Sequence, residues 1–478
     1  MPEKKSKKTA LGYELKNGYE KLGQAEEKQM EAVCSAYMNF LAKSKTERAA
    51  HDEAVALVEN AGYKNLETLI AKKTALKQGD RIYASCAGKT IMALVIGRRP
   101  LEEGMHIVGG HTDAPRLDLK QNPLYENSEL AYFDTHYYGG IKKYQWVTIP
   151  LALYGVFALK NGKILNVAIG DKPGDPVFCI SDLLPHLAQH QNQKKLGEAI
   201  GGEDLDVIVA SRPVTDKNAK QKVKEYVLKH LNKEYGVKEA DFLSAELEIV
   251  PAGAPREVGF DRALILGYGH DDRVCAYSAL QALLDLPAVP QYTACALMCD
   301  KEEIGSAGAT GMESNFFENM VAELVALQSG ADSELAVKRC MRKSKLLSAD
   351  VNAAFDPMFP GVSDKRNSCM VNYGTCLTKY TGARGKSGAN DANAEFVAEV
   401  RYIFDEAKVA WQTGELGKVD QGGGGTIAAI MARYGMDVVD CGVPLLSMHA
   451  PSELASKFDI YMTYKGFRAF FSYSRNRK

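Results

Sequence analysis

The chain has 478 residues, of which 46% are hydrophobic and 25% charged, a composition typical of a folded globular protein rather than a disordered one. Its 59 lysines and arginines against 60 aspartates and glutamates give a formal net charge of −1, which excludes an extended basic surface for nucleic acid. At roughly 150 residues per domain, the length suggests about three domains or two large ones.

Neither a signal peptide nor a membrane helix is predicted. Residues 1–23 contain several lysines but no apolar signal-peptide core. The longest apolar run, residues 146–159, is shorter than the roughly 20 residues of a membrane helix, and Pro150 and Gly155 interrupt it. The ten cysteines include no C-x-x-C pair, which favours reduced thiols in the core. We therefore expect a cytoplasmic protein with no membrane partner.

The predicted elements change in character twice along the chain. Residues 22–60 are helical, residues 81–97 resemble a β-hairpin, and residues 105–110 form a strand that runs into His111. Between residues 120 and 255 come aromatic and glycine-rich strands, with helical patterns near 181–192 and 216–234. Pro251, Gly253 and Pro255 then break the pattern, which marks a domain boundary.

From residue 261 onward, helices alternate with short apolar strands. The strands are predicted at 292–299, 345–350 and 437–441, and the helices near 272–285, 313–328, 390–411, from 426 and at 464–475. This alternation is typical of an α/β sheet whose two faces are covered by helices. The sequence thus predicts one α/β domain that is interrupted near residue 120 by a β-rich insertion and resumes near residue 256.

Polar residues follow the apolar strands of this α/β pattern. In open α/β sheets, ligands bind beyond the carboxyl ends of the strands. The residues at these positions, together with an aspartate that precedes an apolar helix, are His111, Asp113, Asp271, Glu302, Glu303, Asp350 and His449. Taken singly, each has an ordinary structural explanation, such as a turn, a solvated face or a helix cap. Taken together, they share one kind of topological position.

This set has the chemistry of a metal site. Zinc accepts histidine nitrogen and carboxylate oxygen, and two ions about 3.5–4 Å apart need a bridging carboxylate. The five residues that can supply such ligands are His111, Asp271, Glu303, Asp350 and His449. Glu302, next to one ligand, is then suited to act as a general base, and Asp113 is suited to orient His111.

Five motifs in order carry a resemblance to a known family. They are GGHTDAPRLD (109–118), GHDDRVCAYSALQAL (269–283), DKEEIGSAGATG (300–311), SADVNAAFDP (348–357) and, within residues 420–453, DQGGGGTIAAI followed by GVPLLSMHAPSE. The chain resembles the aspartyl aminopeptidase family of dinuclear zinc metallo-aminopeptidases, and in particular its bacterial aminopeptidase 1-like members. The match spans residue 111 to the C-terminus.

The resemblance implies a fold and a set of residue roles. It implies a zinc-exopeptidase-type mixed β-sheet sandwiched by helices, formed by residues 1–120 and 256–478, with an inserted β-rich dimerisation domain at residues 121–255. It implies that His111, Asp271 and Asp350 bind one metal ion, and that Asp271, Glu303 and His449 bind the other. Asp271 would bridge the ions, Glu302 would be the general base and Asp113 its supporting aspartate. Two Zn²⁺ ions are expected, with Co²⁺ or Mn²⁺ as possible replacements.

The resemblance also bears on partners and substrates. DLLPHLAQH (182–190) is similar to a family segment whose histidine, here His186, enters the active site of a neighbouring subunit. The family resemblance implies dimers and a dodecamer, and peptide substrates with a free N-terminus. Between residues 360 and 390, where the family contributes substrate-pocket residues, the match is looser. The sequence therefore leaves open whether the preferred N-terminal residue is acidic or neutral.

Two other functions are compatible with the same set of predicted metal ligands. One is a metal-dependent amidohydrolase, such as a deacylase, with the same pair of ions. The other is a non-catalytic assembly or receptor protein that keeps the fold. A degenerate scaffold is expected to lose Glu302 or a ligand, and this sequence keeps them all. The sequence therefore predicts a metallo-aminopeptidase that acts by a metal-activated water.

Overall fold

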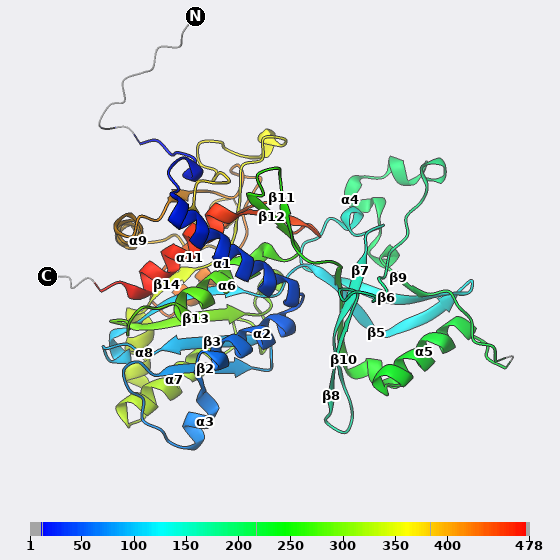
Figure 1. The fold of residues 1–478 in the computed structure, drawn as a ribbon, viewed down its shortest axis with the longest axis horizontal. Helices are drawn as coiled ribbons and strands as arrows, with labels where there is room; N and C mark the ends of the chain where they lie inside the picture. The colour runs from blue at the N-terminus through cyan, green and yellow to red at the C-terminus, as the bar shows by residue number, and fades with distance from the viewer. Residues whose placement is uncertain (1–10, 12, 217, 383, 475–478) are drawn as a thin grey trace, which may run out of the picture.

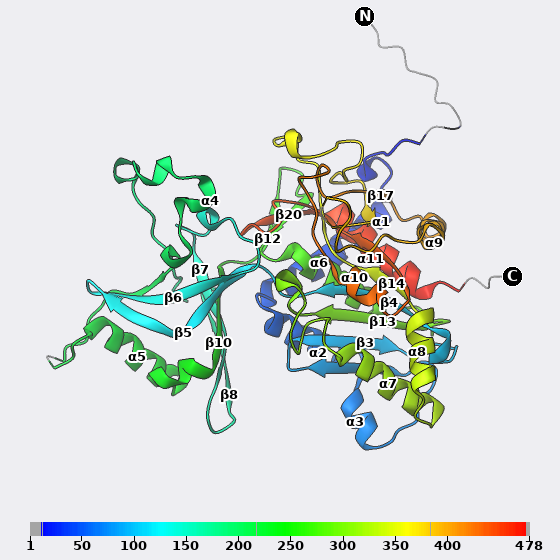
Figure 2. The ribbon, with the colours of Figure 1, turned by 180° about the vertical axis from the view of Figure 1, so that it is seen from behind.

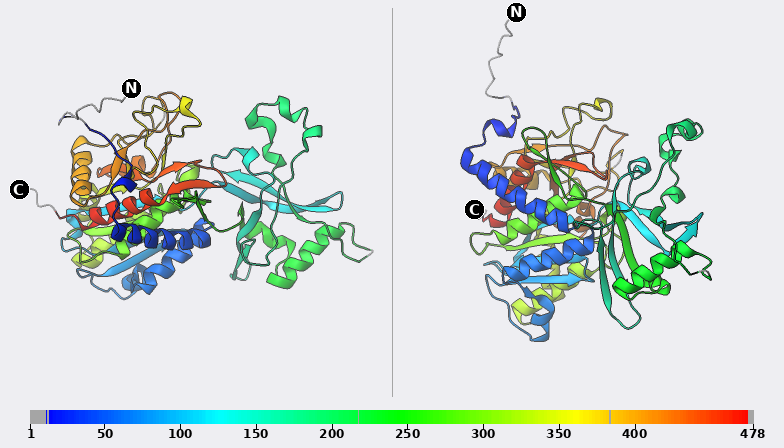
Figure 3. Two further views of the ribbon diagram at one scale, coloured as in Figure 1. Left: turned by 45° about the horizontal axis from the view of Figure 1, so that its top comes forward. Right: turned by 45° about the vertical axis from the view of Figure 1, so that its right-hand side comes forward.

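A computed structural model describes residues 11, 13–216, 218–382 and 384–474; the lysine-rich residues 1–10 lie outside this part. The described chain forms a large helix-covered sheet and, beside it, a smaller unit built mainly from strands (Figure 1 and Figure 3). Among the described residues, no helix is long and apolar enough to cross a membrane. The apolar run at 146–159 instead contains strand β7 (Leu151–Ala158).

The large sheet has nine strands. In spatial order they are β1 (Lys64–Asn65), β2 (Arg81–Cys86), β3 (Thr90–Val95), β13 (Thr293–Cys299), β4 (Met105–His111), β14 (Lys345–Ser348), β18 (Asp437–Gly442), β16 (Thr375–Thr378) and β17 (Trp411–Thr413). The four central strands β13, β4, β14 and β18 run parallel, and Cys299 lies opposite His111 at the ends of β13 and β4. Their carboxyl ends therefore meet along one edge of the sheet.

Helices cover both faces of this sheet, which is why its central strands are mainly buried and apolar. One face carries α1 (Gln24–Lys43), α2 (Glu47–Asn60), α6 (His270–Leu284), α9 (Ala394–Glu406) and α11 (Lys457–Ser472). The opposite face carries α3 (Leu66–Ala71), α7 (Phe316–Ser329), α8 (Glu334–Lys343) and α10 (Ile427–Ala432), of which α7, α8 and α10 are seen in Figure 2. The predicted mixed sheet sandwiched by helices is thus confirmed.

The smaller unit is an antiparallel sheet with its own core. Its strands, in spatial order, are β8 (Ile164–Ile169), β7, β10 (Ala245–Pro251), β5 (Arg116–Asn127), β6 (Leu130–Tyr138) and β9 (Val207–Ala210). Helix α5 (Lys222–Tyr235) packs on this sheet through Val223, Val227 and Leu231. The chain leaves the large sheet after β4 and returns after β10. We propose that a discontinuous catalytic domain, residues 1–120 and 256–478, is interrupted by an inserted domain, residues 121–255; strand β5 crosses the first of these boundaries.

A five-stranded sheet follows the return of the chain from the smaller unit. Its strands, in spatial order, are β11 (Arg256–Val258), β12 (Leu264–Gly267), β20 (Glu453–Ser456), β19 (Pro444–Leu446) and β15 (Asn352–Ala353). Strand β12 precedes α6, and β19 and β20 flank the loop that contains His449. This sheet therefore fixes two segments that reach the carboxyl edge of the large sheet.

Several predicted helices have different bounds in the structure. The helix predicted at 390–411 is only α9, because Lys408 adopts a left-handed backbone conformation (φ 54°) and the chain then enters β17. The last helix begins earlier than residue 464, at Lys457, where the Ser456 side chain accepts hydrogen bonds from the first turn.

The prediction of a helix at 181–192 is wrong. This segment contains only the short 3₁₀ helices η4 (Pro185–Leu187) and η5 (Gln191–Gln193). Pro185 cannot continue a helix from the residues before it. Leu183, Leu184 and Leu187 are also exposed, so no packed face stabilises a longer helix.

Helix α11 packs against α1, α6 and α9 and against strands of the large sheet, so its core side chains should contribute strongly to stability. Phe467 on α11 is fully buried, and Phe467→Ala should lower the free energy of unfolding by about 3–5 kcal/mol in urea denaturation. The matched control is Phe260→Ala, at a fully exposed side chain, which should change stability by less than about 0.5 kcal/mol. Equal effects of the two substitutions would contradict this packing.

Candidate metal centre

The carboxyl edge of the four parallel strands gathers the predicted site residues. His111 ends β4, and Glu302 and Glu303 form a 3₁₀ turn, η8 (Glu302–Ile304), just after β13. Asp350 follows β14. The remaining two come from outside this sheet: Asp271 from the first turn of α6 and His449 from the loop between β19 and β20.

Asp271 lies between two imidazole rings. Its Oδ1 is 3.2 Å from Nε2 of His111, and its Oδ2 is 3.2 Å from Nε2 of His449. Each carboxylate oxygen therefore faces a different histidine. A carboxylate that bridges two cations needs this arrangement, with one oxygen for each ion.

The other carboxylates surround these rings. Glu303 Oε2 is 3.5 Å from Nε2 of His449, and Glu302 Oε2 is 3.8 Å from Nε2 of His111. Two overlapping groups have ligand atoms within 4.8 Å of one another: His111 with Glu302 and Asp350, and His111 with Asp271 and Glu303. Both groups contain nitrogen and oxygen donors of the kind that zinc accepts. Glu302 is close enough to serve either as a ligand or as a base.

The charges of this cluster fit bound cations. Burial and the neighbouring Glu302 carboxylate raise the pKa of Asp350 well above its usual range, and burial and Asp271 do the same for Glu303. Burial is also the main cause that raises the pKa of Glu302, to about 7. Glu303 Oε1 is buried and has no hydrogen-bond partner among the described residues. Crowded carboxylates with an unpartnered buried oxygen are costly unless a cation neutralises them.

Asp271 behaves differently because histidines flank it. Burial raises the pKa of Asp271, but the hydrogen bonds from His111 and His449 outweigh this effect and lower the pKa overall. Asp271 therefore stays ionised, as a bridging ligand must.

Asp113 supports three groups of the cluster at once. Nδ1 of His111 donates to the backbone carbonyl of Asp113 at 3.0 Å and lies 3.3 Å from its carboxylate, which leaves Nε2 free to bind a metal ion. The same carboxylate accepts the backbone N–H groups of Glu302 and Glu303, each at 3.2 Å. Asp113 thus holds both the first histidine and the turn that carries the two glutamates.

Two further carboxylates were not predicted as functional residues. Glu453 is buried, and its two oxygens accept the backbone N–H groups of His449 at 2.7 Å and Asp271 at 3.1 Å. Burial raises the pKa of Glu453 to about 8. Asp272, also buried, accepts the backbone N–H of His111 at 3.2 Å. Glu453 ends the same motif that contains His449, which is the one sequence signal that could have drawn attention to it.

His186 is the predicted residue that the chain does not bring to this site. It lies exposed on η4 of the smaller unit, and among the described residues no hydrogen bond or ion pair joins it to the cluster. The exposed leucines 183, 184 and 187 surround it. A role for His186 therefore depends on a neighbouring subunit.

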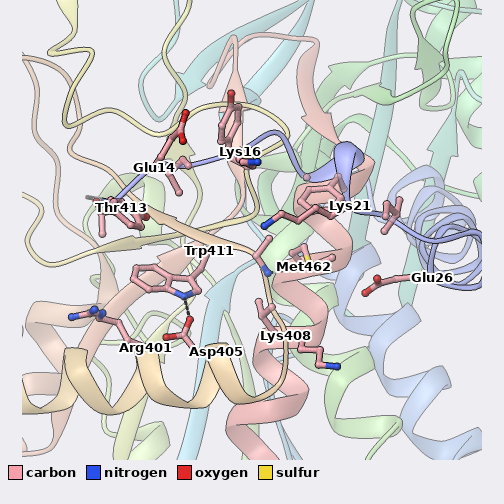
Figure 4. A pocket seen from close by; sticks show the side chains of 18 of the residues that line it. Glu14, Lys16, Lys21, Glu26, Arg401, Asp405, Lys408, Trp411, Thr413 and Met462 are labelled. Atoms are coloured by element: carbon pink, nitrogen blue, oxygen red, sulfur yellow. Dashed lines mark hydrogen bonds between the residues drawn. The ribbon is translucent and has the colours of Figure 1, made fainter. Parts of the chain in front are cut away.

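The cluster opens into a cavity of about 540 Å³. Its walls include Asp271, Glu302, Glu303, Asp350 and His449, together with the backbone of glycines 423–425. A larger pocket of about 1010 Å³ lies under the N-terminal segment, where Trp411 donates a 2.8 Å hydrogen bond to Asp405 (Figure 4). None of the described residues that line that second pocket is a histidine or cysteine.

Comparison with known proteins places the chain in a family. The model of the M18 family, described as aminopeptidase I zinc metalloprotease, matches residues 40–471. The chain belongs to the M18 family of zinc metallopeptidases. It is therefore a metallo-aminopeptidase, and the resemblance drawn from its motifs is confirmed.

The relatives are similar over nearly their whole length. A probable M18 family aminopeptidase 1 of Clostridium acetobutylicum is 52% identical over 457 residues, which cover 96% of this chain and 98% of that protein. The crystal structure of an M18 aminopeptidase of Thermotoga maritima has a TM-score of 0.91 and 44% identity, and covers 96% and 100% of the two chains. The mApe1 dodecamer of S. cerevisiae shares the fold, with a TM-score of 0.74 and 20% identity over 93% of this chain and 97% of that one.

The raised carboxyl pKa values predict how zinc binding depends on pH. Glu303 and Asp350 hold protons to higher pH than ordinary carboxyls, and these protons must leave before a cation binds. The apparent zinc affinity should therefore rise at least about tenfold between about pH 6 and pH 8, with net proton release. Isothermal titration in buffers of different ionisation enthalpy measures both quantities. An affinity that is independent of pH would contradict the expected protonation.

Proposed function

We propose that this M18 aminopeptidase holds two divalent cations and removes N-terminal residues from peptides, with Glu302 as the general base. The position of Asp271, with one carboxylate oxygen toward each of two histidines, is the observation that carries the proposal. Zinc is the expected metal, and Co²⁺ or Mn²⁺ can replace it in such ligand sets. In this proposal His111, Asp271 and Asp350 hold one ion, and Asp271, Glu303 and His449 hold the other.

Two cations in this position supply one kind of chemistry: they polarise the scissile carbonyl and lower the pKa of a nearby water molecule. Glu302 takes the proton of the attacking water and delivers it to the departing amine. Its placement beside His111, with its backbone N–H fixed by Asp113, supports this role. A carboxylate held by the backbone of its own turn can approach the substrate without losing its orientation.

The cavity supports cleavage at a free N-terminus. In this proposal the free α-amine of the substrate binds at the inner wall, to one of the cations or to a carboxylate beside them. Glycines 423–425 have no side chains, so the backbone of a bound peptide can approach this wall closely. An acylated substrate lacks that free amine, which favours an aminopeptidase over a deacylase.

Self-association is part of the proposal. Three exposed leucines flank His186 in the sequence, and exposed apolar side chains of this kind are often buried on assembly. We propose that the inserted unit forms a dimer through this region and that His186 then enters the neighbouring active site, where it can donate a hydrogen bond to the tetrahedral oxyanion. A dodecamer, as in the S. cerevisiae relative, is the larger assembly proposed.

Glu302→Gln distinguishes a general base from a metal ligand. Loss of a general base should lower kcat about 10²–10⁴-fold on aminoacyl-nitroanilide substrates while the zinc content stays at the parental value. The matched control is Glu334→Gln, at a surface side chain paired with Lys338, which should behave as the parent does. A Glu302→Gln protein that hydrolyses at the parental rate would exclude the base, and one that loses zinc would make Glu302 a ligand.

Metal removal tests the two cations directly. Exhaustive chelation should abolish hydrolysis, and stoichiometric return of Zn²⁺, Co²⁺ or Mn²⁺ should restore it, with elemental analysis giving about two ions per subunit. Asp271→Asn should remove more metal than Asp350→Asn, because only the first substitution affects both ions. Full activity of the metal-free protein, or a stoichiometry of one ion, would contradict the proposal.

A further inference from the structure

The last residues of strand β6 and the two glycines after it reach out of the inserted unit to the metal cluster. Tyr138 ends β6, and Gly139 and Gly140 follow it. Each of the three touches a different residue of the cluster. The segment contains no metal-type side chain, so no metal-ligand motif marks it in the sequence.

Tyr138 contacts the cluster through its hydroxyl. The hydroxyl donates a 2.8 Å hydrogen bond to Oδ2 of Asp113, and both side chains are buried. Asp113 in turn orients His111 and holds the backbone of the Glu302–Glu303 turn. A phenol has an ordinary pKa of about 10 and so keeps its donor proton at neutral pH. Tyr138 therefore orients the carboxylate of Asp113, which in turn contacts His111 and the backbone of the Glu302–Glu303 turn.

Arg116 holds the Tyr138 ring in place. The two residues are opposite each other on β5 and β6, and the guanidinium lies over the ring, 3.9 Å from its centre. The guanidinium is buried, and carboxylates of both units hold it: Glu47 of α2 at 3.3 Å and Glu248 of β10 at 3.2 Å. A cation stacked on an aromatic face and held by buried carboxylates restricts the ring to one orientation.

The two glycines meet the other side of the cluster. The carbonyl of Gly140 accepts a 2.9 Å hydrogen bond from Nδ1 of His449, so Nε2 of that ring is the nitrogen left for a metal ion. Gly139 has φ +72°, and a Cβ at this position would lie 3.4 Å from Cβ and 3.5 Å from Oε2 of Glu303. The positive φ favours glycine here, and a Cβ would be in ordinary van der Waals contact with this ligand, so the segment passes close to Glu303.

We propose that Tyr138, Gly139 and Gly140 of the inserted unit are positioning residues of the metal centre. Tyr138 acts on His111 through Asp113, and Gly140 acts on His449 directly, so one segment orients both imidazole rings. The inserted unit is then part of the catalytic machinery within its own subunit, separately from any role in dimerisation. This inference rests on the proposed pair of cations, since positioning is relevant only if these rings bind metal.

The experiment compares zinc affinity, by competition with a chromophoric chelator, between the parent and Tyr138→Phe. Loss of the hydroxyl should weaken zinc binding at least about tenfold, because groups that orient metal ligands typically contribute 10–100-fold. With zinc saturating, kcat should fall while KM stays near the parental value. The control is Tyr137→Phe, a hydroxyl deletion at the neighbouring residue, whose side chain is 42% exposed.

A second pair of variants covers the case in which Tyr138→Phe fails to fold. Gly139→Ala places a methyl group against Glu303, whereas Gly162→Ala, in a turn of the same unit, adds it at a similar backbone angle (φ +84°) with no atom within 4 Å. Both substitutions strain the backbone similarly, so a greater loss of zinc affinity in Gly139→Ala than in Gly162→Ala is expected if the segment positions Glu303. A loss of less than about threefold in both Tyr138→Phe and Gly139→Ala would overturn the inference. If the parent itself bound no zinc, the proposed function would fail instead.

Discussion

The constraint on which the site depends is the burial of several carboxylates in one place. Asp271, Glu302, Glu303 and Asp350 converge on two histidines, and burial, together with neighbouring like charges, raises the pKa of all but Asp271. Such a cluster is unfavourable in a dry interior unless positive charge accompanies it. In a family of zinc metallopeptidases, a bound cation can supply that positive charge.

The sheet makes that burial possible. Four parallel strands end at one edge, so residues that are far apart in the sequence arrive together. His111 and Asp271 are 271 − 111 = 160 residues apart, yet their side chains lie within 3.2 Å. Buried carboxylates then accept hydrogen bonds from backbone N–H groups of the segments that carry the ligands, and so hold these segments in place. Glu453 binds the N–H groups of His449 and Asp271, and Asp113 binds those of the glutamate turn.

The inserted unit is in direct contact with the metal cluster of the large domain. It has a core of its own, yet the end of its strand β6 lies against Asp113 and His449. Arg116, at the start of β5, is held by Glu47 from one unit and Glu248 from the other. A rotation between the units would separate these buried charges, so the contact favours one relative orientation.

Local sequence patterns predicted much of the fold and of the candidate site. The alternation of helices and apolar strands, and the polar residues at the strand ends, led to the sandwiched sheet and to seven residues that the fold does bring together. Local patterns were less informative about where helices end. The segment 181–192 has a helical composition, but its leucines have no core to cover, and only the folded surface reveals that. The length of α9 likewise depends on the turn at Lys408.

Tertiary structure alone decided the contacts between distant groups. Nothing local distinguishes Tyr138 from the tyrosine beside it, or Gly140 from other glycines. Their neighbours are Asp113, 25 residues away, and His449, 309 residues away. The sequence by itself determined which residues have the chemistry to bind metal, because that chemistry belongs to single side chains. Which oxygen of Asp271 faces which histidine, and which buried groups orient those rings, depends on distances that exist only once the chain has folded.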